Sequence, residues 1–145
     1  MIAVDTNILV YAHREESPWH TGAGVCLARL AAERRAWAIP WPCLHEFLAI
    51  ATHPRIFNPP TPARDAIAAV DSWLAVPMLR LLGEEEGYWD QLRELVLSGQ
   101  ALGPRVHDAR VAALCLRHGI TELWSADRDF GRFRRLRVRN PLLEP

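Results

Sequence analysis

The stretch IAVDTNILVYA, at residues 2–12, decides the fold class of this chain. Its first three residues form a short apolar run, which predicts a buried strand. Three polar residues follow at 5–7, and apolar residues then recur at helical spacing, which predicts a helix. A buried strand that leads directly into a helix is the opening of an α/β fold.

The same alternation of strands and helices continues through the chain. The predicted strands cover residues 2–4, 36–40, 78–82, 122–126 and 136–138. The predicted helices cover residues 6–14, 19–33, 41–52, 63–75, 84–97 and 106–117. The glutamates at 84–86 suit the positive end of a helix dipole, and the strand at 78–82 is expected to be buried. Strands joined by right-handed helical crossovers form a parallel sheet with both faces covered.

Length and cysteine content indicate a domain that folds without covalent links. The 145 residues suit a single domain, residues 1–145, that can bury a core of its own. Cys26, Cys43 and Cys115 lie far apart in apolar stretches, so we expect free thiols in the core. No apolar run reaches the length of a membrane span, and no secretory signal precedes the first strand. These features predict a cytoplasmic protein.

Charge is balanced over the whole chain but not along it. All 17 basic residues are arginine, and they equal the 17 acidic residues. Residues 1–104 carry 8 arginines and 12 acids, a formal charge of −4, whereas residues 105–145 carry 9 arginines and 5 acids, a formal charge of +4. A basic segment can follow a phosphate backbone, although arginine-rich surfaces are often only solvated. The absence of lysine excludes a P-loop, since that motif needs a lysine to reach the phosphates.

Several acidic residues fall at one edge of the predicted sheet. Asp5 ends the first strand, and Asp127 and Asp129 follow the fourth. Glu46 and Asp108 lie in the opening turns of helices that can begin at the same edge. Because ligands of open α/β sheets bind beyond the carboxyl ends of the strands, we expect these carboxylates to converge.

Each acid also has an ordinary structural explanation. Asp5 could only cap the helix that follows it, and Asp127 could cap a turn. Glu46 and Asp108 lie among apolar neighbours, where a helix cap or an arginine partner would account for either one separately. The combined set is harder to explain in this way, because a cluster of carboxylates repels itself unless a cation is present.

The residue types in this set favour a hard divalent cation. Oxygen-only ligands favour Mg²⁺ or Mn²⁺ over zinc. The six histidines and three cysteines show none of the spacings of a zinc site. A cation held by carboxylates lowers the pKa of bound water and neutralises charge on phosphate oxygens, which predicts phosphodiester hydrolysis.

Four motifs, in this order, resemble the PIN-domain family and its VapC toxins. They are VDTN at residues 4–7, the helix that carries Glu46, HDA at residues 107–109 and SADRDF at residues 125–130. The resemblance extends from Ile2 to near Pro141. It implies a three-layer α/β fold, in which helices flank a parallel sheet of five strands in the order 3-2-1-4-5.

The resemblance also implies an activity and the residues that carry it. The catalytic and metal-binding acids would be Asp5, Glu46, Asp108 and Asp127, with Asp129 as a further metal ligand. The supporting polar residues would be Thr6, Asn7 and Ser125. The implied enzyme is a Mg²⁺-dependent endoribonuclease, with Mn²⁺ able to substitute, that cuts structured cellular RNA such as tRNA or rRNA. A homodimer and inhibition by a VapB antitoxin are implied as well.

Arginines close to these acids are candidates for RNA contacts. Arg110 and Arg128 stand beside predicted metal-site acids and could hold RNA phosphates, and five arginines between residues 132 and 139 could extend that contact. The alternatives are ion pairs with Asp108 and Asp129, or a solvated surface.

Three other functions compete with the nuclease hypothesis. A phosphatase of the haloacid-dehalogenase type normally has a second aspartate two residues after the first, where this chain has Asn7. A response-regulator receiver needs a lysine, which the chain lacks. A catalytically silent PIN module that only binds RNA or a protein partner is the remaining alternative, and the intact set of acids argues against it.

Overall fold

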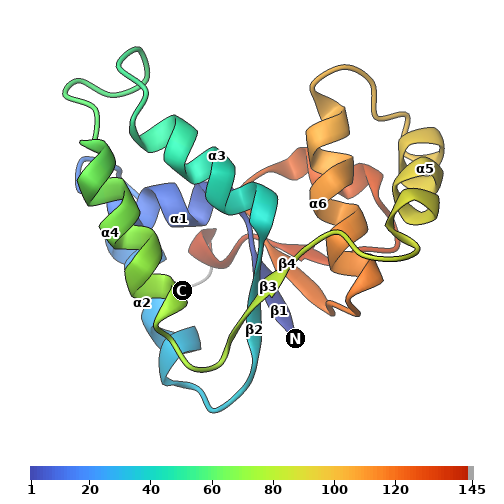
Figure 1. Cartoon of the computed structure of the whole chain (residues 1–145), viewed down its shortest axis with the longest axis horizontal. Helices are drawn as coiled ribbons and strands as arrows, with labels where there is room; N and C mark the ends of the chain where they lie inside the picture. The colour runs from blue at the N-terminus through green and yellow to red at the C-terminus, as the bar shows by residue number, and fades with distance from the viewer. Residues whose placement is uncertain (144–145) are drawn as a thin grey trace.

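The computed structural model describes residues 1–143 and shows a parallel sheet between two layers of helices (Figure 1). Its strands are β1 (Ile2–Val4), β2 (Trp37–Pro40), β3 (Leu79–Leu82), β4 (Glu122–Trp124) and β5 (Val138–Arg139). They pair in the order β3-β2-β1-β4-β5, and every pairing is parallel. The predicted fold class and strand order are therefore confirmed.

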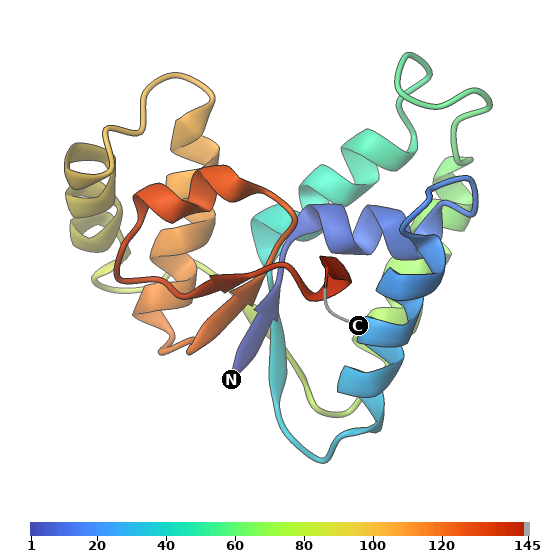
Figure 2. The ribbon, with the colours of Figure 1, turned by 180° about the vertical axis from the view of Figure 1, so that it is seen from behind.

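Helices cover both faces of this sheet. The α-helices are α1 (Thr6–His13), α2 (His20–Ala32), α3 (Trp41–Ala51), α4 (Ala63–Leu74), α5 (Tyr88–Ser98) and α6 (Arg105–Arg117). The short 3-10 helices are η1 (Arg128–Arg132) and η2 (Pro141–Leu143). Helices α1 to α4 lie on one side of the sheet and α5 and α6 on the other, as Figures 1 and 2 show from opposite directions. No helix in the described part of the chain is both long and apolar enough to cross a membrane.

The central strand β1 determines where Asp5 and helix α1 lie. Ala3 and Val4 are fully buried, because β2 and β4 flank this strand and helices cover both of its faces. Ile8 and Leu9 of α1 are buried as well, so the helix packs against the sheet directly after the strand ends. Asp5 consequently leaves the sheet at the middle of its carboxyl edge.

Helix α5 begins later than predicted. We expected a helix from residue 84 with three glutamates in its first turn, but α5 starts at Tyr88. Gly87 adopts a left-handed conformation with φ of 86°, which prevents a continuous helix from residue 84. Glu84 instead pairs with Arg110, and Glu85 lies 3.8 Å from His118. The prediction that these acids open the helix was therefore wrong.

The strand boundaries also differ from the predictions. β3 lies at an edge of the sheet and only Leu82 is fully buried in it, so the expected burial of the whole strand was wrong. β4 ends at Trp124 rather than at residue 126, because the backbone N–H of Ala126 donates to the side chain of Asn7 instead of to a strand. The predicted free, buried state of all three cysteines is confirmed.

Most of the basic C-terminal segment is used within the domain. Arg132 donates to backbone carbonyls of Asp129 and of the α5–α6 loop, and Arg135 pairs with Glu94. Arg137 and Arg139 both pair with the buried Glu122 of β4. These contacts attach the segment after β4 to the rest of the sheet and to α5.

Gly99 provides a test of the packing between α5 and the C-terminal segment, and Gly24 in α2 provides a comparison. A Cβ atom at Gly99 would lie 2.8 Å from the ring of Phe133 and 2.9 Å from the carbonyl oxygen of Leu95. We expect Gly99→Ala to lower the free energy of unfolding by about 1–3 kcal/mol, because neither atom can move freely. Gly24, within α2, has no atom that a Cβ would meet within 4 Å. Gly24→Ala should raise the free energy of unfolding by about 0.5–1 kcal/mol.

Urea denaturation of the two variants measures both effects. Equal stability of the Gly99→Ala variant and the unsubstituted protein would contradict the close packing of Phe133 against α5.

Candidate active site

A pocket of about 320 Å³ opens at the carboxyl edge of the sheet, and all four of the predicted catalytic acids line it. Asp5 follows β1, Glu46 comes from α3, Asp108 comes from α6, and Asp127 follows β4. The four residues are separated by up to 122 positions in the sequence. The predicted convergence is therefore present, and it joins one side chain from each of four segments.

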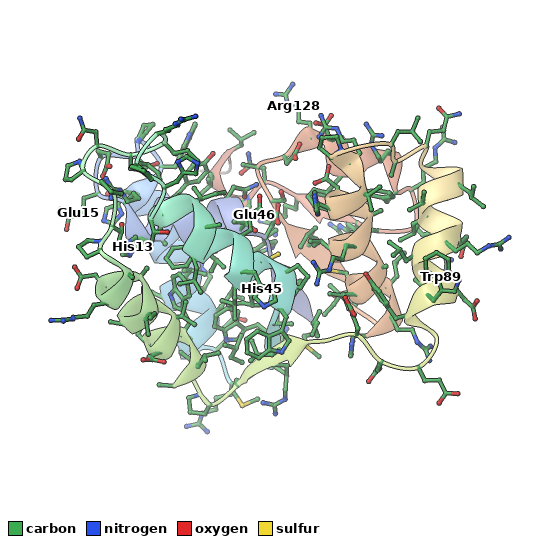
Figure 3. All side chains as sticks on the ribbon, turned by 45° about the horizontal axis from the view of Figure 1, so that its top comes forward. His13, Glu15, His45, Glu46, Trp89 and Arg128 are labelled. Carbon is green, nitrogen blue, oxygen red and sulfur yellow. The ribbon has the colours of Figure 1, made fainter. Side chains whose placement is uncertain are left out.

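The topology of the sheet explains why these segments meet. Asp5 and Asp127 follow adjacent parallel strands and so emerge at the same edge. Helix α3 follows β2 directly, whereas α6 precedes β4 and runs back along the sheet, so the first turns of both helices lie at that edge. Figure 3 shows Glu46 near the centre of the molecule, beside the segment that follows β4.

Asp5 is the most deeply buried of these acids. Its side chain is 5% exposed, and both carboxylate oxygens accept hydrogen bonds. Oδ1 accepts from the backbone N–H of Thr6 at 2.8 Å, and the Cys43 thiol lies 3.5 Å from it. Oδ2 accepts from the Ser125 hydroxyl at 2.7 Å and from the Asn7 amide at 3.2 Å. The carboxylate is thus held in one orientation.

Burial dominates the electrostatics of Asp5. The pKa of Asp5 is raised to about 6, chiefly by removal from water and to a smaller extent by the nearby Glu46 carboxylate. Hydrogen bonds from Ser125, Thr6 and Cys43 act in the opposite direction, because they stabilise the charged form. They do not offset the desolvation, so the ionised carboxylate is an unfavourable group in the cation-free protein.

The predicted supporting residues connect the acids to one another. The Thr6 hydroxyl donates to Glu46 Oε2 at 3.1 Å, which links α1 to α3. The Ser125 hydroxyl accepts from the Asn7 amide at 3.1 Å and from the backbone N–H of Asp127 at 3.0 Å. One hydroxyl and one amide therefore tie the ends of β1 and β4 together.

Asp108 occupies the opposite wall, at the first turn of α6. Burial raises the pKa of Asp108, while the guanidinium of Arg105 lowers it and the nearby Asp127 and Asp129 raise it. Asp129, the predicted fifth ligand, does not line the pocket. It lies in η1 and is joined to Asp108 through Arg105, which contacts Asp108 at 3.2 Å and Asp129 at 2.5 Å.

Arg105 is a site residue that the sequence reasoning missed. The spacing of three residues between Arg105 and Asp108 at the start of a predicted helix was the available signal, since side chains at that spacing can pair. The contact with Asp129 had no local signal, because it spans 24 positions.

The pocket also has an apolar wall that the sequence did not reveal. Tyr11, Ile50, Ile56, Phe57 and Phe130 line the cavity together with the acids. The guanidinium carbon of Arg14 lies 4.2 Å from the ring centre of Phe57, and Arg14 also donates to the carbonyl oxygen of Pro59. These contacts attach the loop after α3 to the end of α1.

The two arginines predicted to contact RNA line two different hollows that adjoin the pocket. Arg110 pairs with Glu84 at 3.3 Å and lines a groove of about 540 Å³ between α3 and α6. Arg128 is exposed and projects from the surface in Figure 3. The ion pairs expected as an alternative, from Arg110 or Arg128 to Asp108 or Asp129, are not formed among the described residues. Arg105 contacts both of these acids instead.

The donor chemistry of the pocket fits a hard divalent cation. Four carboxylates and the hydroxyl of Thr6 supply oxygen atoms, and one carboxylate is almost fully desolvated. Among residues 1–143, no three His, Cys, Asp or Glu side chains already stand close enough together to hold one ion.

Comparison with known proteins agrees with the fold and with the site motifs. The family model described as "PIN domain" matches residues 2–136. Ribonuclease VapC43 of Mycobacterium tuberculosis is 42% identical over 142 residues, which cover 98% of this chain and 96% of the relative. Among solved structures, VapC20 of M. tuberculosis, described as a Sarcin-Ricin loop cleaving toxin, superposes with a TM-score of 0.69 at 18% identity, covering 90% of this chain and 93% of that one.

A second solved structure is VapBC2 from Rickettsia felis, bound to a DNA fragment from its promoter. It superposes with a TM-score of 0.66 at 20% identity and covers 96% of this chain and 98% of that one. At such identities the two structures establish the shared fold, while the matches to the family model and to VapC43 establish descent. The chain therefore belongs to the PIN-domain family, within its group of VapC ribonucleases.

Proposed function

We propose that this chain is a Mg²⁺-dependent endoribonuclease and the toxin of a type II VapBC toxin–antitoxin pair. One observation carries the proposal: four carboxylates from four separate segments line a single pocket. The similarity to proteins named VapC ribonucleases over nearly the whole chain supports RNA as the substrate. In this proposal Asp5, Glu46, Asp108 and Asp127 hold the cation, Asp129 assists, and Mn²⁺ can replace Mg²⁺.

The chain's own residues would then prepare the site for the cation and the scissile phosphate. When bound there, Mg²⁺ would lower the pKa of a water molecule and offset the negative charge that grows on the phosphate oxygens. Thr6 orients the Glu46 carboxylate, while Ser125 and Asn7 fix the Asp5 carboxylate. The protein therefore orients Asp5 and Glu46 before any ligand arrives, which reduces the entropic cost of assembling the site.

The arginines around the pocket support a phosphodiester substrate, because its phosphate groups are negatively charged. The groove between α3 and α6 is lined by His45, His107, Arg105 and Arg110, and it adjoins the pocket because Glu46 and Asp108 line both. Arg128 lines a further hollow that adjoins the pocket, because Asp127 lines both. We propose that RNA, such as a structured region of tRNA or rRNA, crosses the acids between Arg110 and Arg128.

The partners in this proposal are a VapB-type antitoxin and a second copy of the chain. The R. felis structure is named as a complex of both toxin and antitoxin, which supports a protein partner for this fold. Large apolar side chains are exposed at Trp89, Leu97 and Leu102, around α5 and the loop that follows it. Exposed apolar residues of this size often mark protein interfaces, so they supply surface for either partner.

The substitution Asp5→Asn tests the catalytic role. It keeps the shape of the side chain but removes one metal-binding charge, so we expect Mg²⁺-dependent cleavage of total RNA to fall by at least ~100-fold. Circular dichroism should show an unchanged fold. Gel analysis of RNA fragments with and without EDTA measures the loss, and undiminished cleavage by the variant would rule out this site. Absence of cleavage by the unsubstituted protein would instead favour a PIN module that only binds RNA or a protein partner.

The pKa of Asp5 predicts how the stability of the cation-free protein changes with pH. Folding raises this pKa from 3.8 to about 6, so the folded state favours the protonated form. The resulting stabilisation is complete below about pH 4 and is lost as pH rises through about 6, with a magnitude of at most ~3 kcal/mol. We therefore expect the free energy of unfolding in EDTA to decline between those pH values, with a smaller decline in Asp5→Asn.

Added Mn²⁺ should oppose this decline, because a bound cation stabilises the ionised carboxylate. Urea denaturation at several pH values, with EDTA or Mn²⁺, measures both effects. The same slope in Asp5→Asn and in the unsubstituted protein would show that Asp5 is not the titrating group.

Toxicity tests the biological part of the proposal. We expect induced expression in bacteria to arrest growth, because cleavage of tRNA or rRNA stops translation, and we expect Asp5→Asn to be harmless. Colony counts after induction measure the effect. Normal growth with abundant, folded and unsubstituted protein would contradict a toxin role while leaving the nuclease activity to be tested in vitro.

A further inference from the structure

Arg105 stands in an unusual place for a basic residue. It is the first residue of α6, where the helix dipole is positive and acidic side chains are preferred. Its side chain is 41% exposed, yet the guanidinium is directed at acids of the site. A cation at this end of a helix needs negative partners to offset the dipole, and Asp108 and Asp129 provide them.

The two acids come from different parts of the site. Asp108 belongs to α6 and lines the pocket, whereas Asp129 belongs to η1, two residues beyond Asp127. The Asp127 carboxylate accepts from the backbone N–H of Asp129 at 2.8 Å, which joins Asp129 in η1 to Asp127 at the start of that helix. Arg105 therefore bridges the wall formed by α6 and the wall formed by the segment after β4.

Negative charge in the site exceeds what Arg105 alone can neutralise. Asp5, Glu46, Asp108, Asp127 and Asp129 carry five formal negative charges, and Arg105 is the basic residue that pairs with two of them. A divalent cation in the pocket would compete for the same Asp108 oxygen that accepts from Arg105. Cation and guanidinium would also repel each other at such short range.

We propose that Arg105 is an internal counter-ion that occupies Asp108 and Asp129 in the cation-free enzyme and yields Asp108 when the divalent cation binds. The released guanidinium already lies in the lining of the groove between α3 and α6, beside His107 and Arg110. There it binds a phosphate of the RNA strand next to the scissile bond. Arg105 thus exchanges a carboxylate for a substrate phosphate, and cation binding and RNA binding favour each other.

This inference rests on the proposed function for the identity of the cation and the substrate. It makes a further claim of its own, which is that one residue weakens cation binding and strengthens RNA binding. A residue with a merely structural role would weaken both when substituted. The opposite signs therefore separate the two explanations.

The substitution Arg105→Gln tests the inference, with Mn²⁺ alone as the first probe. We expect the dissociation constant for Mn²⁺, measured by isothermal titration calorimetry, to fall by about three- to tenfold, because a competing positive charge is removed. At saturating Mn²⁺, the KM for a single-stranded RNA oligonucleotide should rise by about five- to tenfold with a smaller change in kcat. Weaker Mn²⁺ binding, or an unchanged Mn²⁺ affinity, would overturn the proposal, as would an unchanged KM.

Two further variants serve as matched controls. Arg110→Gln removes an equal charge from the same helix and the same groove, but Arg110 pairs with Glu84 rather than with a site acid. Its Mn²⁺ affinity should stay within about twofold of the unsubstituted protein, since no competitor for the pocket is removed. Arg105→Lys retains the charge and should keep most of both affinities, so it remains informative if Arg105→Gln fails to fold.

The measurements also separate this inference from the proposed function. Absence of Mn²⁺ binding or RNA cleavage in the unsubstituted protein would reject the metal-dependent nuclease. Normal binding and cleavage there, together with tighter Mn²⁺ binding by Arg110→Gln as well, would reject the specific role of Arg105 alone.

Discussion

A carboxylate removed from water at the end of the central strand is the constraint on which the rest of this structure depends. Burial of Asp5 raises its pKa to about 6, so its charge must be compensated by nearby groups. Its carboxylate accepts hydrogen bonds from the Ser125 hydroxyl, the Asn7 amide and the Thr6 backbone N–H. The Thr6 contact also caps α1, and Asn7 in addition accepts from the Ala126 N–H just beyond β4, so the site and the local fold share residues.

Like Asp5, other acids of the site have partners within the protein. Without a cation, each acid needs a partner within the protein, and Thr6 provides one for Glu46 as Arg105 does for Asp108. These partners allow the domain to fold with its acids close together, although like charges repel.

The parallel topology explains why the four acids meet at one edge of the sheet. Residues that follow β1 and β4, and the first turns of α3 and α6, meet at the carboxyl edge whatever side chains fill the core. The fold is accordingly shared with VapC20 at 18% identity. Around this acidic edge, the apolar residues near Phe57 and the basic residues near Arg110 line the pocket and the adjoining groove.

The sequence by itself determined the alternation of strands and helices, the buried cysteines and the four acids, because each rests on local periodicity or on a motif within a few residues. The acids alone predicted phosphodiester hydrolysis. The strand order and the RNA substrate were implied by the resemblance that the four motifs carry together. Tertiary structure alone decided that α5 begins after Gly87, that Arg105 rather than Arg110 pairs with the site acids, and that Phe57 lines their pocket. These features depend on contacts between residues that lie far apart in the chain, or on a backbone conformation set by such contacts, and no local pattern records them.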